Sequence, residues 1–459
     1  MKARQFPVKV IQFGKGNFLR GFSTWMVEIL NRETDFGGMV EIVETFDTRK
    51  SEQLVLQDFK YHVTERGVES DKVIERITLV QSVSGLTNPS KLVDEFLKLA
   101  LEPELKFIIS NTTEAGIVFK QDDNEKSQPK TFPARLTALL FHRYEHFSNS
   151  QEKIFILPCE LIDNNADALK EIILKYCQLW KLSKDFTYWL DNKIVFCNTL
   201  VDRIVSGYPK APEAFKKKMD FEDKLMVECE PFHIWAIENK GNLHHYFPVN
   251  KTELNVQFVR DIKPYKEIKV RILNGCHTAM VAIGMLNNIR TVKDFMSNQD
   301  LKLFLDDMLA YDILPTLSDY KTDAIDFRNQ VFDRFENPFL EHELSTIQLN
   351  SISKFKSRLL PPLKDYLNKN GELPNYIPTV LAHLLWLYKD DKSPLGIQLK
   401  DEEHIMNIFK LAWSENNIEM AVSSLLGNEN LWGENLLLIK GLWEVVIAHT
   451  DKLSNDGDF

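Results

Sequence analysis

The sequence has few cysteines, no long apolar run and no excess of basic residues among its 459 positions. Its five cysteines form no C-x-x-C pair, which excludes the usual spacing of a zinc site or a dithiol redox couple and predicts reduced, buried thiols. No uncharged stretch approaches the roughly 20 residues that cross a bilayer. The first residues also lack the apolar core of a signal peptide. These absences predict a cytoplasmic protein with no membrane partner.

Charge and ligand spacing argue against two further classes. The 66 acidic residues outnumber the 56 basic ones, for a formal charge of −10, so no nucleic-acid partner is expected and any anionic ligand must be held by a local group of cations. His142 and His146 have a spacing that a helical metal site could use, but no third ligand lies nearby in the sequence. We therefore predict no bound metal.

The first half of the chain alternates short β-branched runs with helical patterns, which is typical of an α/β fold with a parallel sheet covered by helices. Strands are predicted at residues 8–13, 39–44, 73–80, 107–110, 154–157 and 194–197, and a helix with one apolar stripe at 17–31. After Pro264 long helical patterns dominate, at 269–285, 300–314, 344–358, 378–388 and 436–449. We predict two domains, an α/β domain at 1–262 and a mostly α-helical domain at 263–459.

A glycine-rich turn follows the first predicted strand, in the segment FGKGNF. Gly14 would permit the tight turn, Gly16 would let the backbone approach a pyrophosphate, and Asn17 and Phe18 open the helix whose N–H groups face that anion. The third position of the usual G-x-G-x-x-G pattern is Leu19. An ordinary strand–helix turn is therefore the alternative to a dinucleotide site.

An acidic residue near the end of the second predicted strand would bind the adenosine ribose of the dinucleotide, and Glu44 and Asp47 are the candidates. A carboxylate at this place favours NAD because it repels the additional phosphate of NADP. Arg49 and Lys50 follow closely and could hold that phosphate. We predict NAD, with NADP and a plain solvated loop as the alternatives.

Three polar residues in the segment EIKVRILNGCHTAMV fit on one helical face. At about 100° per residue, Asn274 lies roughly 140° and His277 roughly 80° from Lys269. A lysine, an amide and an imidazole can serve as proton donor, hydrogen-bond donor to an oxyanion and orienting partner for a carbonyl under reduction. The alternative is an amphipathic helix whose polar residues face water.

Several longer segments resemble the mannitol dehydrogenase family of long-chain polyol and sugar-acid dehydrogenases: FGKGNFLRGF, NTTEAGI, NTLVDRI, CEPFHIWAIE and DIKPYKEIKVRILNGCH. The resemblance runs from Gln12 to about Leu360. It implies a Rossmann-type N-terminal domain, a helical substrate and catalytic domain, and metal-independent, NAD-dependent hydride transfer with Lys269 as general acid/base. Within the family, the segments are most similar to the branch that interconverts the sugar acids D-tagaturonate and D-altronate.

The resemblance also implies roles for residues outside the helix of Lys269. Asp202 and Arg203 of the VDRI segment would lie beside the substrate, and Thr113 and Glu114 near the nicotinamide. The segment CELIDNN keeps Asn165 at one of two positions where the mannitol enzymes carry asparagines, so Asn165 is a second candidate donor to the oxyanion.

One departure from the family concerns the substrate's own charge. A substrate-binding arginine of the family corresponds to Thr346, while its lysine partner corresponds to Lys354. Lys354, Arg358 and Arg203 are therefore the candidates for binding a sugar-acid carboxylate. Two alternatives stay open: fructuronate (mannonate) or mannitol reduction by the same chemistry, and a catalytically silent dinucleotide sensor.

Overall fold

The computed structural model describes residues 6–44, 49–69, 72–112, 116–123, 128–219, 221–415 and 417–456. The chain forms two compact units, one of Met1–Arg66 with Val73–Ile262 and one of Gly67–Lys72 with Lys263–Phe459. Within the described ranges, no helix is both long and apolar enough to span a membrane. All five cysteines are free and buried, as the sequence predicts.

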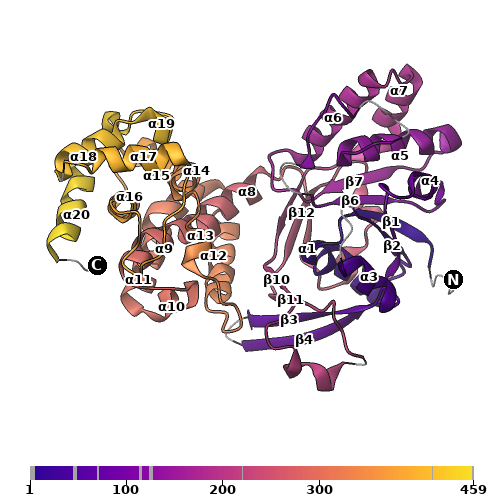
Figure 1. The fold of residues 1–459 in the computed structure, drawn as a ribbon, viewed down its shortest axis with the longest axis horizontal. Coiled ribbons are helices and arrows are strands. Elements are labelled where there is room, and N and C mark those ends of the chain that lie inside the picture. The colour runs from indigo at the N-terminus through magenta and orange to yellow at the C-terminus, as the bar shows by residue number, and fades with distance from the viewer. Residues whose placement is uncertain are drawn as a thin grey trace. The chain divides into compact units, whose positions relative to one another are not determined.

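The first unit is built on a six-stranded sheet in the order β5-β2-β1-β6-β7-β8 (Figure 1). The strands are β1 (Val8–Phe13), β2 (Met39–Val43), β5 (Val83–Thr87), β6 (Phe107–Ser110), β7 (Ile154–Pro158) and β8 (Ile194–Phe196). Every neighbouring pair is parallel. Counted along the chain, the sheet strands have the order 3-2-1-4-5-6 of a Rossmann fold, which confirms the predicted class.

Both faces of this sheet are covered, because successive side chains of each strand enter different cores. Val10 belongs to one core, whereas Ile11 and Phe13 belong to the other. Helices α4 (Val93–Lys98), α5 (Phe132–Phe147), α6 (Asn165–Leu179) and α7 (Lys184–Lys193) cover the Ile11 face (Figure 1). Helix α2 (Ser23–Glu33) and a three-stranded sheet of β9 (Thr199–Asp202), β12 (Ile234–Glu238) and β13 (Val256–Val259) cover the other.

One predicted strand lies outside the Rossmann sheet. Residues 73–80 fall in β4 (Lys72–Val80), which joins β3 (Tyr61–Glu69), β11 (Val227–Cys229) and β10 (Val205–Gly207) in a separate four-stranded sheet. Much of β4 is solvent-exposed, with Val73 at 64%. The third strand of the Rossmann sheet is instead β5, VSGLT, whose glycine and short polar residues give only a weak strand signal.

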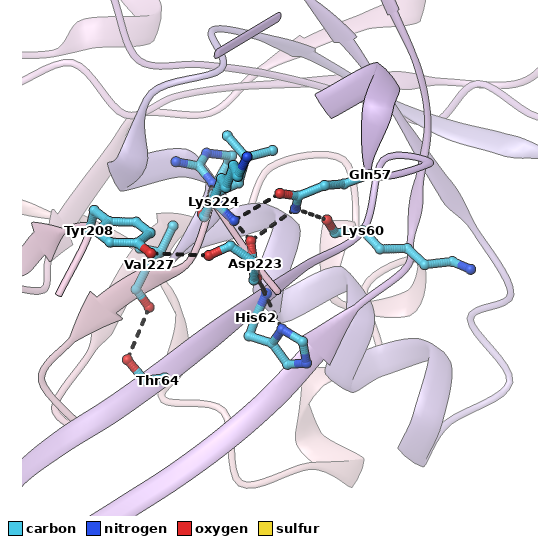
Figure 2. Close-up of polar contacts among 10 residues, drawn as sticks. Gln57, Lys60, His62, Thr64, Tyr208, Asp223, Lys224 and Val227 are labelled. Atoms are coloured by element: carbon cyan, nitrogen blue, oxygen red, sulfur yellow. Dashed lines mark hydrogen bonds and ion pairs between the residues drawn. The ribbon is translucent and has the colours of Figure 1, made fainter. Parts of the chain in front are cut away.

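A buried polar network around Asp223 ties the four-stranded sheet to neighbouring segments (Figure 2). The Asp223 carboxylate accepts hydrogen bonds from the backbone N–H of His62 at 2.5 Å and from Gln57 Nε2 at 2.9 Å, and its Oδ2 lies 3.0 Å from His62 Nδ1. Burial opposes ionisation of Asp223, but these hydrogen bonds lower its pKa. Tyr208 donates to the Asp223 carbonyl at 3.2 Å. This network is a structural support of the first unit.

The second unit is mostly helical in its described part, and α9 (Gly275–Leu286) and α16 (Ile377–Leu387) are its most buried helices. The other elements include α10 (Val292–Ser297), α11 (Gln299–Asp307), α12 (Lys321–Phe335), α13 (Leu344–Ile347), α14 (Ser351–Arg358), α15 (Leu360–Asn370), α17 (Glu403–Ala412), α18 (Ile418–Leu426) and α20 (Leu442–Asp456). Apolar residues surround both α9 and α16, as expected for helices buried on all sides.

The burial of His383 in α16 can be tested by measuring how the free energy of unfolding depends on pH. His383 is 4% exposed, and burial lowers its pKa to about 4. Between about pH 4 and the ordinary value near 6.5, the unfolded chain binds a proton that the native chain does not, so stability falls as the pH falls, by up to about 1.4 kcal/mol per pH unit. We expect His383→Leu to unfold with a flatter pH dependence between pH 7 and 5 in urea titrations.

The matched control is His404→Leu, which makes the same substitution at an exposed histidine outside the core. Equal slopes for wild type and His383→Leu would contradict the assignment of a neutral, buried His383.

Candidate active site

The glycine turn lies at the carboxyl end of β1, where Rossmann folds bind dinucleotides. Gly14 has φ = +119°, a conformation that side chains rarely adopt, and its N–H donates to Val43 O at 2.9 Å. A Cβ at Gly16 would meet no protein atom within 4 Å. The backbone at Gly16 is therefore open to a ligand, which fits the close approach of a pyrophosphate. Asn17 begins α1 (Asn17–Arg20), and the Phe18 ring stacks on Phe22 at 4.9 Å.

Glu44 follows β2 directly, at the place expected for the ribose-binding carboxylate. It is 4% exposed and forms an ion pair with Lys15 of the glycine turn. Ser51 donates to its Oε2 at 2.6 Å and Asn88 to its Oε1 at 2.9 Å. This network fixes the Glu44 carboxylate beside the turn. Oε2 accepts from both Lys15 and Ser51, so Oε1 is the oxygen that keeps a second lone pair for a ribose hydroxyl. Lys15 as its partner was not foreseen from the sequence.

Three predicted cofactor residues, Asp47, Thr113 and Glu114, lie outside the described residues. Next to Thr113, the described end of β6 is held by Glu160, which the sequence reasoning did not single out. Glu160 accepts from Ser110 Oγ at 3.0 Å and from the Thr112 N–H at 2.8 Å. Burial raises the pKa of this carboxyl.

Asn165 occupies a fully buried position at the start of α6. Its amide nitrogen donates to the carbonyls of Pro158, Glu160 and Thr199 at 2.9–3.1 Å, and its oxygen accepts from the N–H of Thr199 at 3.0 Å. Every hydrogen-bonding capacity of the amide nitrogen is used within the chain. These contacts give Asn165 a structural role. Its donation to an oxyanion stays a prediction, and it would require the exchange of one of these hydrogen bonds.

Asp202 and Arg203, at the end of β9, are buried as well. Asp202 is 7% exposed, and the Arg203 side chain is fully buried. Arg203 forms an ion pair with Glu65 at 2.8 Å, donates to the carbonyls of Gly21 and Glu230 at 2.7 and 3.0 Å, and covers the Trp25 ring at 4.2 Å. Arg203 is therefore held by partners within the first unit, and its contact with substrate stays a prediction.

Lys269, Asn274 and His277 lie on one continuous helical segment that is not a plain α-helix. Lys269 ends α8 (Lys263–Lys269), the π turn η7 covers Val270–Asn274, and His277 lies in the first turn of α9. A π turn closes hydrogen bonds between residues five apart, and such turns occur often at functional sites. Lys269 and Asn274 are five residues apart. The π turn therefore places their side chains more nearly on the same face of the helix than a regular α-helix would.

The side chains of this trio have different environments. Lys269 and Asn274 are partly exposed, and the Asn274 amide makes no hydrogen bond to any described residue, unlike that of Asn165. His277 is 8% exposed and packs against Phe335 at 4.9 Å. The ring of His342 meets it edge-on at 5.0 Å. Burial and, to a smaller extent, Arg334 lower the pKa of His342.

His342 was missed by the sequence reasoning because it lies in an irregular segment with no periodic pattern. Cys276, between the polar residues of the trio, is fully buried, and burial raises its pKa well above the usual value. A neutral thiol of this kind is a packing residue and a poor nucleophile.

The two predicted cations of α14 differ in their contacts. Lys354 Nζ donates to Ile347 O at 2.6 Å. Arg358 donates to Asn274 O and to Thr278 Oγ1, both at 3.3 Å, and so lies against the helix that carries the trio. Thr346 donates its hydroxyl to Glu343 O and supplies no charge.

A Rossmann sheet with an open glycine turn can bind a dinucleotide, and a lysine beside an uncommitted amide and an imidazole can move the proton of a CH–OH group. The class of protein that these units define is a dehydrogenase. Residues 8–251 match the mannitol dehydrogenase Rossmann domain, and residues 261–453 the mannitol dehydrogenase C-terminal domain. The chain belongs to the mannitol dehydrogenase family, and it is an oxidoreductase that acts on CH–OH groups with a nicotinamide dinucleotide.

Individual relatives agree with this membership. A Phocaeicola vulgatus protein named altronate oxidoreductase is 38% identical, over 99% of this chain and 96% of the relative. One of the same name from Pectobacterium carotovorum is 39% identical, over 96% of this chain and 93% of the relative. The fold resembles that of Pseudomonas fluorescens mannitol 2-dehydrogenase, solved with NAD and D-mannitol, with a TM-score of 0.72 and 19% identity over 98% of this chain and 93% of that one.

Proposed function

We propose that the protein is a tagaturonate reductase, also called altronate oxidoreductase, which interconverts D-tagaturonate and D-altronate with NAD. The observation that carries this proposal is the similarity to relatives named altronate oxidoreductase, at 38–39% identity over almost the whole of both chains. No metal is required, because a lysine supplies the acid that a metal would otherwise provide.

The chemistry divides between the cofactor and three side chains. A nicotinamide dinucleotide, when bound, would supply the hydride for reduction of the ketone. Lys269 donates the proton to the carbonyl oxygen, and accepts it when altronate is oxidised. The uncommitted amide of Asn274 donates a hydrogen bond to the developing alkoxide. His277, held by Phe335 and His342, orients Lys269 or a substrate hydroxyl.

The cofactor would be held by Gly14, Gly16, Asn17 and Phe18 at its pyrophosphate, with Glu44 at the adenosine ribose. The fixed position of the Glu44 carboxylate supports NAD over NADP, because an anion beside the 2′-hydroxyl repels a phosphate at that place. Asp47, Thr113 and Glu114 stay candidates for the ribose and the nicotinamide end, and Asp202 for the substrate.

The test is an assay with three ketoses and two cofactors. D-tagaturonate, D-fructuronate and D-fructose are each offered with NADH and with NADPH, and oxidation of the cofactor is followed by its absorbance. We expect kcat/KM to be highest for tagaturonate with NADH, by roughly tenfold or more over each alternative, since a misplaced hydroxyl or a missing carboxylate leaves polar groups of the site unpaired.

Each alternative has its own outcome in this assay. Higher kcat/KM with fructuronate or fructose would assign the protein to mannonate or mannitol chemistry. No cofactor oxidation with any of the three would favour a silent dinucleotide sensor.

A further inference from the structure

A cavity of about 200 Å³ lies in the second unit, between α8 and the junction of α14 with α15. We call it the Arg358 cavity. Its walls are Lys263, Lys266, Glu267, Val270 and Arg271 on one side and Ser357, Arg358 and Pro361 on the other. Four of these side chains are cationic and one is acidic. In a protein whose total charge is −10, such a cavity is a local group of cations of the kind that an anionic ligand needs.

The carboxylates near the cavity form ion pairs with cations other than Arg358. Glu267 lies 3.9 Å from Lys263 Nζ. Asp365 pairs with Arg271 at 2.7 Å. Across the described ranges, no carboxylate comes within ion-pair distance of the Arg358 guanidinium. Of the two arginines in the cavity wall, Arg271 is therefore paired with a carboxylate and Arg358 is not.

Arg358 is nevertheless partly desolvated, and burial lowers its pKa to about 10. Its hydrogen bonds to Asn274 O and Thr278 Oγ1 are both 3.3 Å long, beyond the common range of about 2.7–3.2 Å, and both use the same nitrogen. A desolvated cation with only weak neutral acceptors is unfavourable unless an anion joins it. The other N–H groups of its planar fork match the two oxygens of a carboxylate.

The position of the cavity connects it with the reaction. Lys266, in the cavity wall, precedes Lys269 by one helical turn, although Lys269 itself is not a wall residue. Arg358 contacts the backbone of Asn274 itself. A carboxylate bound by Lys266 and Arg358 would therefore lie against the helical segment that carries the proton donor, as suits an acid whose carbonyl is remote from its carboxylate.

We propose that the Arg358 cavity binds the carboxylate of the sugar-acid substrate, with Arg358 as the bidentate partner and Lys266 as a second cation. This inference rests on the proposed function, because it takes a sugar acid as the substrate. It also explains how the protein could bind a carboxylate with Thr346 in place of the family's arginine. Arg358, on the next helix α14, would supply the missing positive charge.

The experiment compares Arg358→Gln with Lys356→Gln, which removes the same charge from an exposed position on the same helix. Steady-state kinetics are measured on the complete enzyme with saturating NADH and varied tagaturonate. We expect Arg358→Gln to raise KM roughly tenfold or more with kcat changed far less, since the contact exists in ground and transition states alike. Lys356→Gln should leave both constants near wild type.

Two further measurements make the result decisive. Lys266→Gln, a change at a partly exposed site, should raise KM a few-fold even if Arg358→Gln is unstable. Inorganic phosphate should inhibit the wild type competitively against tagaturonate. An unchanged KM in both variants, or phosphate inhibition that is not competitive, would overturn the proposal, the latter because it indicates a separate site for free anions.

Failure of the proposed function would look different. If the wild type reduces fructuronate and not tagaturonate, the same variants are measured with fructuronate, and a raised KM still supports the cavity. If the wild type reduces only uncharged fructose, the cavity has no substrate carboxylate to bind and the proposal is wrong.

Discussion

Replacement of Lys269 by alanine is expected to lower kcat for tagaturonate reduction by about 10²- to 10⁴-fold, the usual contribution of a positioned general acid. The alanine leaves the carbonyl oxygen without its proposed proton donor, whereas the glycine turn and Glu44, the residues proposed to hold the dinucleotide, belong to the other unit. The dissociation constant of NADH, measured by fluorescence titration, should therefore stay within about twofold of wild type. Turnover is measured by NADH oxidation.

The matched control is Lys293→Ala, which removes an exposed lysine from α10 in the same unit and should leave kcat unchanged. A small primary amine added to Lys269→Ala should restore part of the activity, because it supplies the missing acid. Wild-type turnover in Lys269→Ala would remove the lysine from the mechanism, and loss of NADH binding would point to a structural defect instead.

The main features of the first unit could be predicted because they depend on local patterns. Residues 8–13 and 107–110 are strands with the predicted bounds, since each is a short run of residues buried on both faces. Gly14 has the positive φ that its place after β1 suggests. The predicted helix at 17–31 is interrupted at Gly21 and Phe22, where α1 ends and α2 has not begun. The apolar stripe continues across this break, so periodicity could not reveal it.

The π turn was hidden for a different reason. Its residues, VRILN, have ordinary helical preferences, and only the five-residue spacing from Lys269 to Asn274 distinguishes the segment. Periodicity at 3.6 residues per turn treats that spacing as a deviation. A second π turn, at Met308–Ile313, interrupts the predicted helix at 300–314 in the same way.

The candidate site shows what the sequence alone could not reveal: two residues of the same type differ in their hydrogen-bond and ion-pair partners in the structure. Asn165 and Asn274 were both proposed as donors, yet the first is fully hydrogen-bonded within the chain and the second is not. Arg203 and Arg358 were both proposed as substrate cations. Glu65, which neutralises Arg203, is 138 positions away in the sequence. No local pattern reports a partner at that distance.

Replacement of Arg203 by leucine is expected to destabilise the first unit by about 3–5 kcal/mol, the usual cost of removing one partner of a buried ion pair. The variant leaves the Glu65 carboxylate, 5% exposed, without its cation and deprives the carbonyls of Gly21 and Glu230 of their donor. The measurement is the urea midpoint of the transition that reports on the first unit, followed by tryptophan fluorescence, since Arg203 covers the Trp25 ring.

The double variant Arg203→Leu/Glu65→Leu separates the charge from the packing. It removes the stranded carboxylate and should recover part of the lost stability, because an apolar pair can replace a buried ion pair, while the two carbonyls stay without donors. Arg32→Leu, at an exposed site on α2, is the control and should unfold near the wild-type midpoint. If Arg203→Leu keeps the wild-type midpoint but raises KM for the sugar acid, then Arg203 contacts the substrate, and the assignment of the carboxylate to the Arg358 cavity has to be shared with it.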